Sequence, residues 1–237
     1  MVSKTTIRDL QRDMKSVGVY SGNVDGSWGP LSHGAFLNAR RLSSKSNVTP
    51  PKDMSELLFM YCKSVAWSNN VSDEFIAEVK RISKDLDLSF QGTDELMSCM
   101  AFESGGTFSP TIQNGAGAPY YGIIQFGAAA AKDAGTSIPA LLKMTNVQQV
   151  QYVYNFFKPY KGKLKGLSDM YLRILYPVAV GKPEDYVLFS ENGRGRAYAQ
   201  NHGLDVNRDG KITKGEAAAK VMQKLVEGLH PKNLRTA

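Results

Sequence analysis

The chain has 237 residues, of which 42% are hydrophobic and 22% charged, a balance typical of a globular protein with a sizeable core. No stretch approaches the roughly 18 uninterrupted apolar residues of a membrane-spanning helix, so we expect no stable membrane insertion. The net charge of +7 favours polyanionic partners, but the basic residues are scattered rather than massed in one arm, which argues against nucleic acid.

The N-terminal part of the sequence predicts a small helical domain. Apolar residues recur at helical spacing in three stretches, at about residues 6–17, 32–37 and 54–67. Gly18 is placed to end the first helix in a left-handed conformation, and a polar, proline-containing break over residues 43–51 precedes the third. We therefore expect a three-helix domain over residues 1–68.

The rest of the sequence, residues 69–237, predicts a second and larger domain. Helical spacing is found at about residues 72–86, 93–102, 128–134, 146–157, 169–175 and 214–229. Ser72 is placed to cap the first of these helices, and the glycine-rich stretch 105–121 is expected to be an irregular loop. Because alternating strand-like patterns are scarce, the predicted fold is mainly α.

The cysteines and histidines provide no metal-binding pattern. Cys62 and Cys99 lie far apart between apolar residues, which is typical of buried free thiols. His33, His202 and His230 are isolated from one another, and no pair has the helix-face spacing of zinc ligands. These patterns argue against a zinc amidase or peptidase.

One motif begins in the first predicted helix and continues through the turn after it. Its three segments, in chain order, are Ile7-Arg8-Asp9-Leu10-Gln11, Val17-Gly18-Val19-Tyr20-Ser21-Gly22 and Val24-Asp25-Gly26-Ser27-Trp28-Gly29-Pro30. This order resembles the three-helix peptidoglycan-binding domain of bacterial and phage cell-wall enzymes. Gly26 permits positive φ in a tight loop, and Asp25 can accept hydrogen bonds from its backbone. Tyr20 and Trp28 offer flat faces for sugar rings or for the core. The alternative is a helical hairpin with a purely structural turn.

A second motif centres on Glu103. This residue ends an apolar helix and precedes Gly105 and Gly106, which let a substrate approach the backbone closely. An acid on a helix packed into the core loses hydration, which raises its pKa and retains its proton near neutral pH. Such an acid can protonate the leaving oxygen of a glycosidic bond.

Two further segments strengthen the hypothesis about Glu103. Together with Glu103-Ser104-Gly105, the segments Tyr121-Gly122-Ile123-Ile124-Gln125-Phe126 and Asp169-Met170-Tyr171-Leu172 resemble the goose-type-lysozyme-like and lytic-transglycosylase superfamily. The resemblance implies a lysozyme-like helical fold and cleavage of the bond between N-acetylmuramic acid and N-acetylglucosamine, with Glu103 as general acid. It implies substrate contacts from Ser104, Tyr121, Ile123, Gln125 and Tyr171. The sequence departs from the superfamily at Arg173-Ile174-Leu175-Tyr176-Pro177, where many relatives have asparagine and glycines.

The type of reaction stays open at this point. Hydrolysis normally uses a second carboxylate, for which Asp133 and Asp169 are candidates. Without one, the substrate's own 6-hydroxyl or acetamido group can complete the reaction, which would be lytic transglycosylation.

A third motif, over residues 205–216, fits the twelve-residue EF-hand calcium loop. The calcium ligands expected from this pattern are Asp205, Asn207, Asp209, the backbone carbonyl of Lys211, Thr213 and Glu216. Gly210 stands at the sixth position, where the loop turns sharply. Because only one such loop is visible, we expect a structural Ca²⁺ rather than a regulatory sensor, and no organic cofactor.

The order of the two domains resembles that of modular phage endolysins, with a wall-binding module before a catalytic one. The first residues of the chain lack the apolar core of a secretory signal peptide. We therefore expect a monomer that stays in the host bacterial cytoplasm until lysis and then acts on peptidoglycan in the periplasm or cell wall. The alternative is a non-enzymatic, calcium-dependent wall-binding or virion structural protein in which Glu103 is inert.

Overall fold

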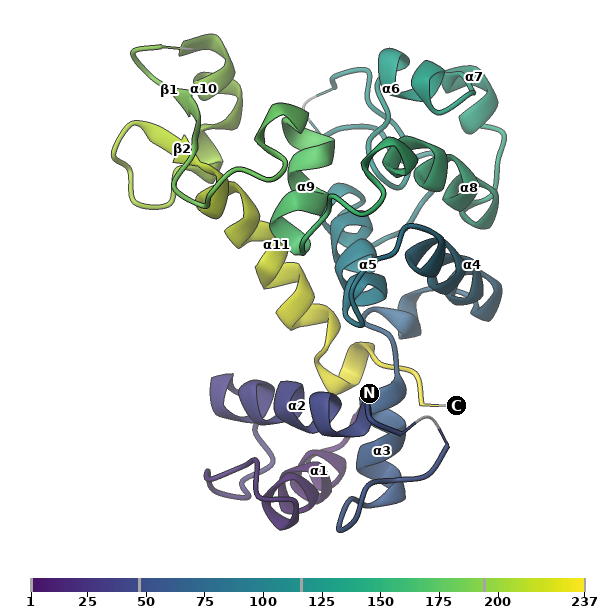
Figure 1. Cartoon of the computed structure of the whole chain (residues 1–237), viewed down its shortest axis with the longest axis vertical. Coiled ribbons are helices and arrows are strands. Elements are labelled where there is room, and N and C mark those ends of the chain that lie inside the picture. Colours follow the sequence, from purple (N-terminus) through teal and green to yellow (C-terminus); the bar gives the residue numbers. More distant parts are fainter. Residues whose placement is uncertain (1, 47, 116, 194, 237) are drawn as a thin grey trace. The chain divides into compact units, whose positions relative to one another are not determined.

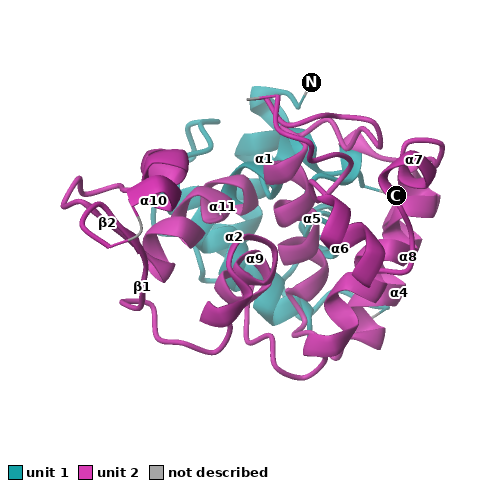
Figure 2. Cartoon of the chain, turned by 90° about the horizontal axis from the view of Figure 1, so that it is seen from above, with its two compact units in different colours: residues 1–69, 226–237 teal, residues 70–225 magenta. Residues whose placement is uncertain are grey.

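The computed structural model describes residues 2–46, 48–115, 117–193 and 195–236, and these residues form a mainly helical structure (Figure 1). Eleven α-helices and two short strands occur among them, which confirms the predicted mainly α class. Residues 47 and 116, within the expected polar break and glycine-rich loop, lie outside the described residues. The chain divides into two compact units, Met1–Asn69 with Val226–Ala237 as unit 1 and Asn70–Leu225 as unit 2 (Figure 2).

Unit 1 contains three helices, α1 (Lys4–Ser16), α2 (Pro30–Ser43) and α3 (Glu56–Lys63), and the 3-10 helix η5 (Pro231–Asn233). Ser3 caps α1 by accepting a hydrogen bond from the N–H of Thr6 at 3.0 Å, and Gly18 follows its end with φ +76°. One face of α1 is buried, including Leu10 and Met14, as the apolar spacing predicts.

The C-terminal residues belong to unit 1, whereas the sequence placed everything after residue 68 in one domain. The N–H of Trp67 donates to the carbonyl of Gly228 at 3.1 Å. Ser64 Oγ donates to the carbonyl of Arg235 at 2.8 Å, and the N–H of Arg235 donates to Ser68 Oγ at 2.8 Å. These contacts join residues more than 160 positions apart, so no local pattern could have indicated them.

Unit 2 holds most of the helices. Its elements, with two that cross the unit boundaries, are η1 (Ser68–Asn70), α4 (Asp73–Asp85), α5 (Gly92–Glu103), α6 (Ala128–Asp133), α7 (Ile138–Leu141), α8 (Asn146–Phe157), η2 (Lys158–Tyr160), α9 (Leu167–Leu175), η3 (Pro177–Ala179), β1 (Val187–Ser190), α10 (Gly195–Asn201), η4 (His202–Leu204), β2 (Lys211–Thr213) and α11 (Lys214–Gly228). Ser72 caps α4 as predicted, accepting from the N–H of Phe75 at 3.3 Å. The strands β1 and β2 pair antiparallel.

Helix α5 is the central helix of unit 2 and packs against α4 and α9 (Figure 1). It is buried on nearly all sides, so its polar residues Asp94, Glu95 and Ser98 lie in the interior together with Cys99. Cys62 and Cys99 are both free and buried, as expected. None of the helices in the described part of the chain combines the length and the apolar character that crossing a membrane requires.

Candidate functional site

Glu103 is the last residue of α5, and the chain turns immediately after it. Gly105 and Gly106 have φ of +62° and +81°, and the N–H of Gly106 donates to the carbonyl of Ala101 at 2.7 Å. The Glu103 side chain is partly exposed, but the surrounding atoms displace most of its water, and this burial raises its pKa to about 8. The carboxyl group therefore holds a proton at neutral pH and has access to solvent.

Two other ionisable groups lie close to Glu103. Cys99 is one helical turn earlier on the same face of α5, and Tyr171 approaches from α9, where its ring packs edge-on against Phe102 at 5.3 Å between centroids. Burial raises the pKa of both Cys99 and Tyr171 well above the usual values, and the charge of Glu103 raises them further. Cys99 and Tyr171 are therefore neutral neighbours of the acid.

Ser104 organises the turn that follows the acid. Its hydroxyl is fully buried, donates to the carbonyl of Met100 at 2.7 Å and accepts from the N–H of Phe108 at 3.0 Å. The Ser104 carbonyl accepts from the hydroxyl of Thr107 at 2.7 Å. Because no part of Ser104 is exposed, its side chain acts on the loop and through it on the position of Glu103.

The segment from Tyr121 to Phe126 is a tight turn closed by reciprocal backbone hydrogen bonds between these two residues, at 3.1 and 2.7 Å. Gly122 has φ +80°, and a Cβ there would lie 2.6 Å from Gln149 Oε1. Ile123 is fully buried, so its side chain faces the core of unit 2. The turn therefore needs glycine both for its backbone conformation and for space.

Gln149 on α8 was missed by the sequence analysis although it holds this turn in place. Its Oε1 accepts from the N–H of Ile123 at 3.2 Å, and its Nε2 donates to the carbonyls of Pro110 at 2.8 Å and Leu141 at 2.9 Å. The side chain is fully buried. The available signal was an amide on the apolar face of a predicted helix, flanked by Val150 and Val153.

Gln125 has two unfavourable features. Its φ is +54°, which is uncommon for a residue other than glycine, and its Oε1 is buried with no hydrogen-bond partner among the described residues. Its Nε2 donates to the carbonyls of Ile112 and Gly122, both at 3.3 Å. Residues with a strained backbone or with an unsatisfied buried polar atom occur more often at functional sites than elsewhere.

Gln125 lines a cavity of about 640 Å³ in unit 2, within the size range of small-molecule sites. Its walls are mostly apolar, and its polar lining residues are Tyr120, Tyr121, Gln125, Asp133 and Arg173. The expected contact residues thus fall into two groups. Tyr121 and Gln125 line the cavity, whereas Glu103, Ser104, Ile123 and Tyr171 do not.

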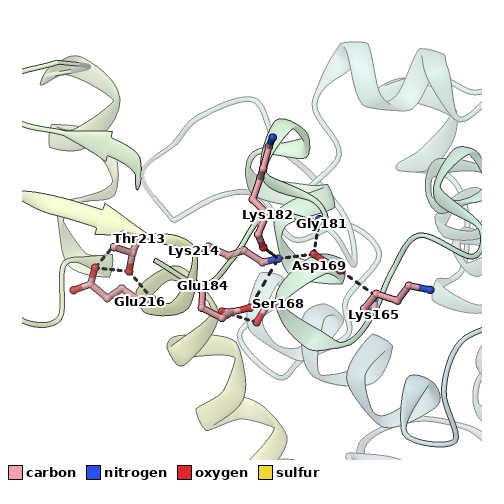
Figure 3. A network of polar contacts seen from close by, with 9 residues as sticks. All are labelled: Lys165, Ser168, Asp169, Gly181, Lys182, Glu184, Thr213, Lys214 and Glu216. Carbon is pink, nitrogen blue, oxygen red and sulfur yellow. Dashed lines mark hydrogen bonds and ion pairs between the residues drawn. The ribbon is translucent and has the colours of Figure 1, made fainter. Parts of the chain in front are cut away.

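The two candidate second carboxylates have different surroundings. Asp133 is exposed at the end of α6. Asp169 is buried on α9, where its Oδ1 lies 2.6 Å from Lys214 Nζ and accepts from the N–H of Gly181 at 2.8 Å (Figure 3). Burial alone would raise the pKa of Asp169, but the hydrogen bonds from Lys214 and from backbone N–H groups hold it below its usual value. Asp169 is therefore a charged member of a buried ion pair.

The expected calcium loop lies between η4 and α11. Asp205 Oδ1 accepts from the N–H of Arg208 at 2.7 Å, and its Oδ2 accepts from the N–H of Gly210 at 3.1 Å and from the hydroxyl of Tyr198 at 2.7 Å. Gly210 has φ +79°, in agreement with its place at the sharp turn. Asn207 Oδ1 accepts from the N–H of Asp209 at 2.9 Å.

The second half of the loop begins at Lys211, whose N–H donates to Asp209 Oδ1 at 2.9 Å. Glu216 Oε2 accepts from the N–H of Thr213 at 2.9 Å and from its hydroxyl at 2.8 Å. Ile212 is fully buried in β2. Among the described residues, no three acidic, histidine or cysteine side chains converge closely enough to form a metal cluster.

The N-terminal motif is held together by Gln11, a fully buried residue of α1 and the last residue of the segment Ile7–Gln11 with which the motif begins. Its Nε2 donates to Asp25 Oδ1 at 3.0 Å and to the Tyr20 hydroxyl at 3.2 Å, and its Oε1 accepts from the N–H of Gly26 at 2.9 Å. The hydrogen bond from Gln11 lowers the pKa of Asp25. Trp28 packs edge-on against Phe36 at 5.5 Å.

The expected wall-binding residues therefore make hydrogen bonds and packing contacts that stabilise unit 1 itself. Tyr20 and Gly26 are buried, and a Cβ on Gly26 would lie 2.9 Å from the carbonyl oxygen of Lys4. Asp25 is exposed and Trp28 is partly exposed, so these two present surface to a ligand.

No protein-family model matches the chain, and a comparison with curated proteins also finds no match.

Proposed function

We propose that the chain is a peptidoglycan-degrading glycosidase of the modular phage endolysin type, which cleaves between N-acetylmuramic acid and N-acetylglucosamine. The observation that carries the proposal is the environment of Glu103, whose pKa is raised to about 8 by burial while the side chain keeps partial exposure. Such a carboxylic acid is protonated at neutral pH and can donate its proton to the leaving glycosidic oxygen. Unit 2 would be the lysozyme-like catalytic part.

The other residues of unit 2 have supporting roles in this proposal. Tyr171 and Cys99 provide a neutral, poorly hydrated surrounding that keeps Glu103 protonated. Ser104 and Gln149 position the acid and the Gly122 turn, and Ile123 anchors that turn through its buried side chain. Tyr121 and Gln125 line the cavity and would contact the glycan.

Of the two possible reactions, lytic transglycosylation has the stronger support. Hydrolysis needs a second carboxylate as base, and the ion pair with Lys214 removes Asp169 from the two candidates. Hydrolysis would therefore have to rely on Asp133 alone, whereas transglycosylation needs neither residue. In transglycosylation the 6-hydroxyl oxygen attacks the anomeric carbon of the same muramic acid, the bond to the leaving oxygen breaks, and Glu103 supplies that oxygen with its proton. The proton of the 6-hydroxyl then restores the acid.

Mass spectrometry of fragments released from purified peptidoglycan tests both the activity and the reaction type. We expect anhydromuramic ends, which are lighter by one water than the reducing ends left by hydrolysis. Reducing ends would instead assign hydrolysis and make Asp133 the candidate base. Failure to release any soluble fragment would contradict the glycosidase proposal itself.

Unit 1 would bind the cell wall. The proposal rests on the exposed Asp25 and the partly exposed Trp28 of the loop organised by Gln11, with Tyr20 and Gly26 shaping that loop. A net charge of +7 would add attraction to an anionic envelope, and this part should weaken with salt. Peptidoglycan is thus the proposed partner, and a monomer released at lysis is the proposed form.

We further propose that residues 205–216 bind one structural Ca²⁺. The loop has the required turn at Gly210, the required buried apolar residue at Ile212, and oxygen-bearing side chains at Asp205, Asn207, Asp209, Thr213 and Glu216. With the carbonyl of Lys211, these are the ligand types that calcium prefers. The ion would neutralise the carboxylates and fix the start of α11.

Calcium is expected to raise the melting temperature of the protein because it binds only the folded loop. At a hundredfold excess over the Kd the stabilisation is about 2.7 kcal/mol, or roughly 5–10 °C for a chain of this size. Differential scanning fluorimetry with calcium or with a chelator measures the shift. Asp205→Ala should abolish the shift and the exposed Asp185→Ala should retain it, whereas equal shifts in both variants would contradict the site.

A further inference from the structure

We propose that Arg173 makes the 640 Å³ cavity of unit 2 a binding site for a carboxylate-bearing group of the substrate, the free carboxylates on the peptide stems of peptidoglycan. This inference rests on the proposed function for the identity of the substrate. The role falls on Arg173, the first residue of the segment 173–177 at which the sequence departs from the lysozyme-like superfamily.

The Arg173 guanidinium is held rigidly. Its Cζ lies 3.9 Å from the ring centroid of Phe156 and 4.6 Å from that of Tyr160. Its Nε and Nη2 both donate to the carbonyl of Phe156, at 3.2 and 2.9 Å. Because stacking and hydrogen bonds already fix the side chain, a ligand would not have to immobilise it.

The remaining nitrogen, Nη1, is available to a ligand. Within the described ranges it donates to no protein acceptor, and Arg173 has no ion-pair partner within 4.0 Å. Nη1 is also not among the buried unpartnered atoms, so it keeps contact with solvent, and Arg173 is one of the residues that line the cavity. Arg173 therefore presents a positive charge with no direct ion-pair partner, partly offset by Asp133 on the same cavity wall, and a fixed N–H donor, which together suit a carboxylate.

The rest of the cavity fits an amphipathic ligand. Residues 128–130 with Ile138 and Pro139 form an apolar wall, and Tyr120, 47% exposed, offers a ring face for a sugar. A peptide-substituted muramic acid combines a sugar ring, alkyl groups and free carboxylates. A neutral N-acetylglucosamine oligomer has no carboxylate and would leave Arg173 unpaired.

Direct binding to the full chain carrying Glu103→Gln tests the inference without turnover. The probes are a disaccharide-tetrapeptide from peptidoglycan with free carboxylates and the same compound with its carboxylates amidated, each titrated by calorimetry. Adding Arg173→Met should weaken binding of the free acid about tenfold, as expected for one charge-assisted hydrogen bond, and leave the amide unchanged. The affinity of Arg173→Lys for the free acid should be intermediate. The control Lys132→Met removes the same charge at an exposed site outside the cavity and should have little effect on that affinity.

Arg173→Met could weaken binding simply by loosening the packing against Phe156, so a second variant tests the charge without changing that packing. Asp133→Asn, at an exposed position on the cavity wall, removes a negative charge and should tighten binding of the free acid about two- to threefold. Equal affinity for the acid and the amide, absence of binding for both, or no effect of either substitution would overturn the inference.

The two proposals can fail separately. Binding that depends on Arg173, without any cleavage of peptidoglycan by the wild-type chain, would support the carboxylate site and contradict the glycosidase. Cleavage with no dependence of binding on Arg173 would overturn the site alone.

Discussion

Glu103→Gln is expected to reduce the release of soluble fragments from purified peptidoglycan by about 10²- to 10⁴-fold, the usual contribution of a general acid. Glutamine has nearly the same shape but cannot supply a proton to the leaving oxygen. Turbidity of a peptidoglycan suspension, followed together with the fragments released, measures the effect. The matched control is Glu78→Gln on the surface of α4, which changes the same group outside the site and should retain activity.

The pH dependence of both activity and stability should follow from the titration of Glu103. In the proposed mechanism the protonated form of Glu103 is the active one, so activity should fall as pH rises through the Glu103 pKa of about 8. Folding raises this pKa from 4.5, so the stability contributed by the protonated group is complete below pH 4.5 and is lost as pH rises to about 8. Glu103→Gln lacks this loss and should melt at a higher temperature than wild type above pH 8.

Equal clearing of peptidoglycan by wild type and Glu103→Gln, with both variants folded, would contradict the glycosidase. The alternative of a calcium-dependent wall-binding or virion structural protein would then be preferred. Loss of activity together with an unchanged melting profile at about pH 4 is the result that separates a catalytic role from a structural one. At that pH, below the ordinary pKa of 4.5, the glutamate of wild type and the glutamine of the variant are both largely neutral in the folded and the unfolded chain.

Local features of the fold could be predicted well from the sequence. The apolar run before Glu103 and the glycines after it predicted a helix over 93–102, and α5 extends by only one residue at each end. The cap at Ser72 was predicted because its chemistry is local. The pairing of β1 with β2 was missed because strands of four and three residues are too short to show alternation.

The parts of the candidate site that depend on distant contacts could not be predicted. Asp169 was a candidate base, but its partner Lys214 lies 45 residues away, and only the fold reveals the ion pair. Gln11 and Gln149 organise the two motifs from buried positions, although sequence reasoning usually assigns glutamine to the surface. Arg173 lines the cavity because α9 carries it there, and no spacing in the sequence indicated this.

The buried pair of Lys214 and Asp169 is expected to give the largest effect on stability. Both side chains are nearly inaccessible, at 4% and 6% exposure, and Lys214 Nζ also donates to the carbonyl of Lys182 at 2.7 Å (Figure 3). Lys214→Met would leave the Asp169 carboxylate buried without its cation, which typically costs about 3–5 kcal/mol. For a chain of this size, that corresponds to a fall in melting temperature of roughly 10 °C or more.

The pair also connects two proposed sites within unit 2. Lys214 lies between the proposed calcium ligands Thr213 and Glu216, and Asp169 precedes Tyr171 by two residues on α9. Loosening the pair should therefore lower the proposed glycosidase activity through Tyr171, even at temperatures where the variant is folded. The control is Lys161→Met, which breaks the exposed pair with Asp87 at 3.3 Å and should cost less than about 1 kcal/mol.

A double-mutant cycle decides whether the interaction itself is responsible. Asp169→Asn in the Lys214→Met background removes the stranded charge, so the double variant should be more stable than Lys214→Met alone. Thermal unfolding of the four proteins measures the coupling. Additive losses would mean that Lys214 stabilises unit 2 through its aliphatic stem and its bond to Lys182, and that Asp169 remains adequately solvated by the N–H groups of Gly181 and Lys165.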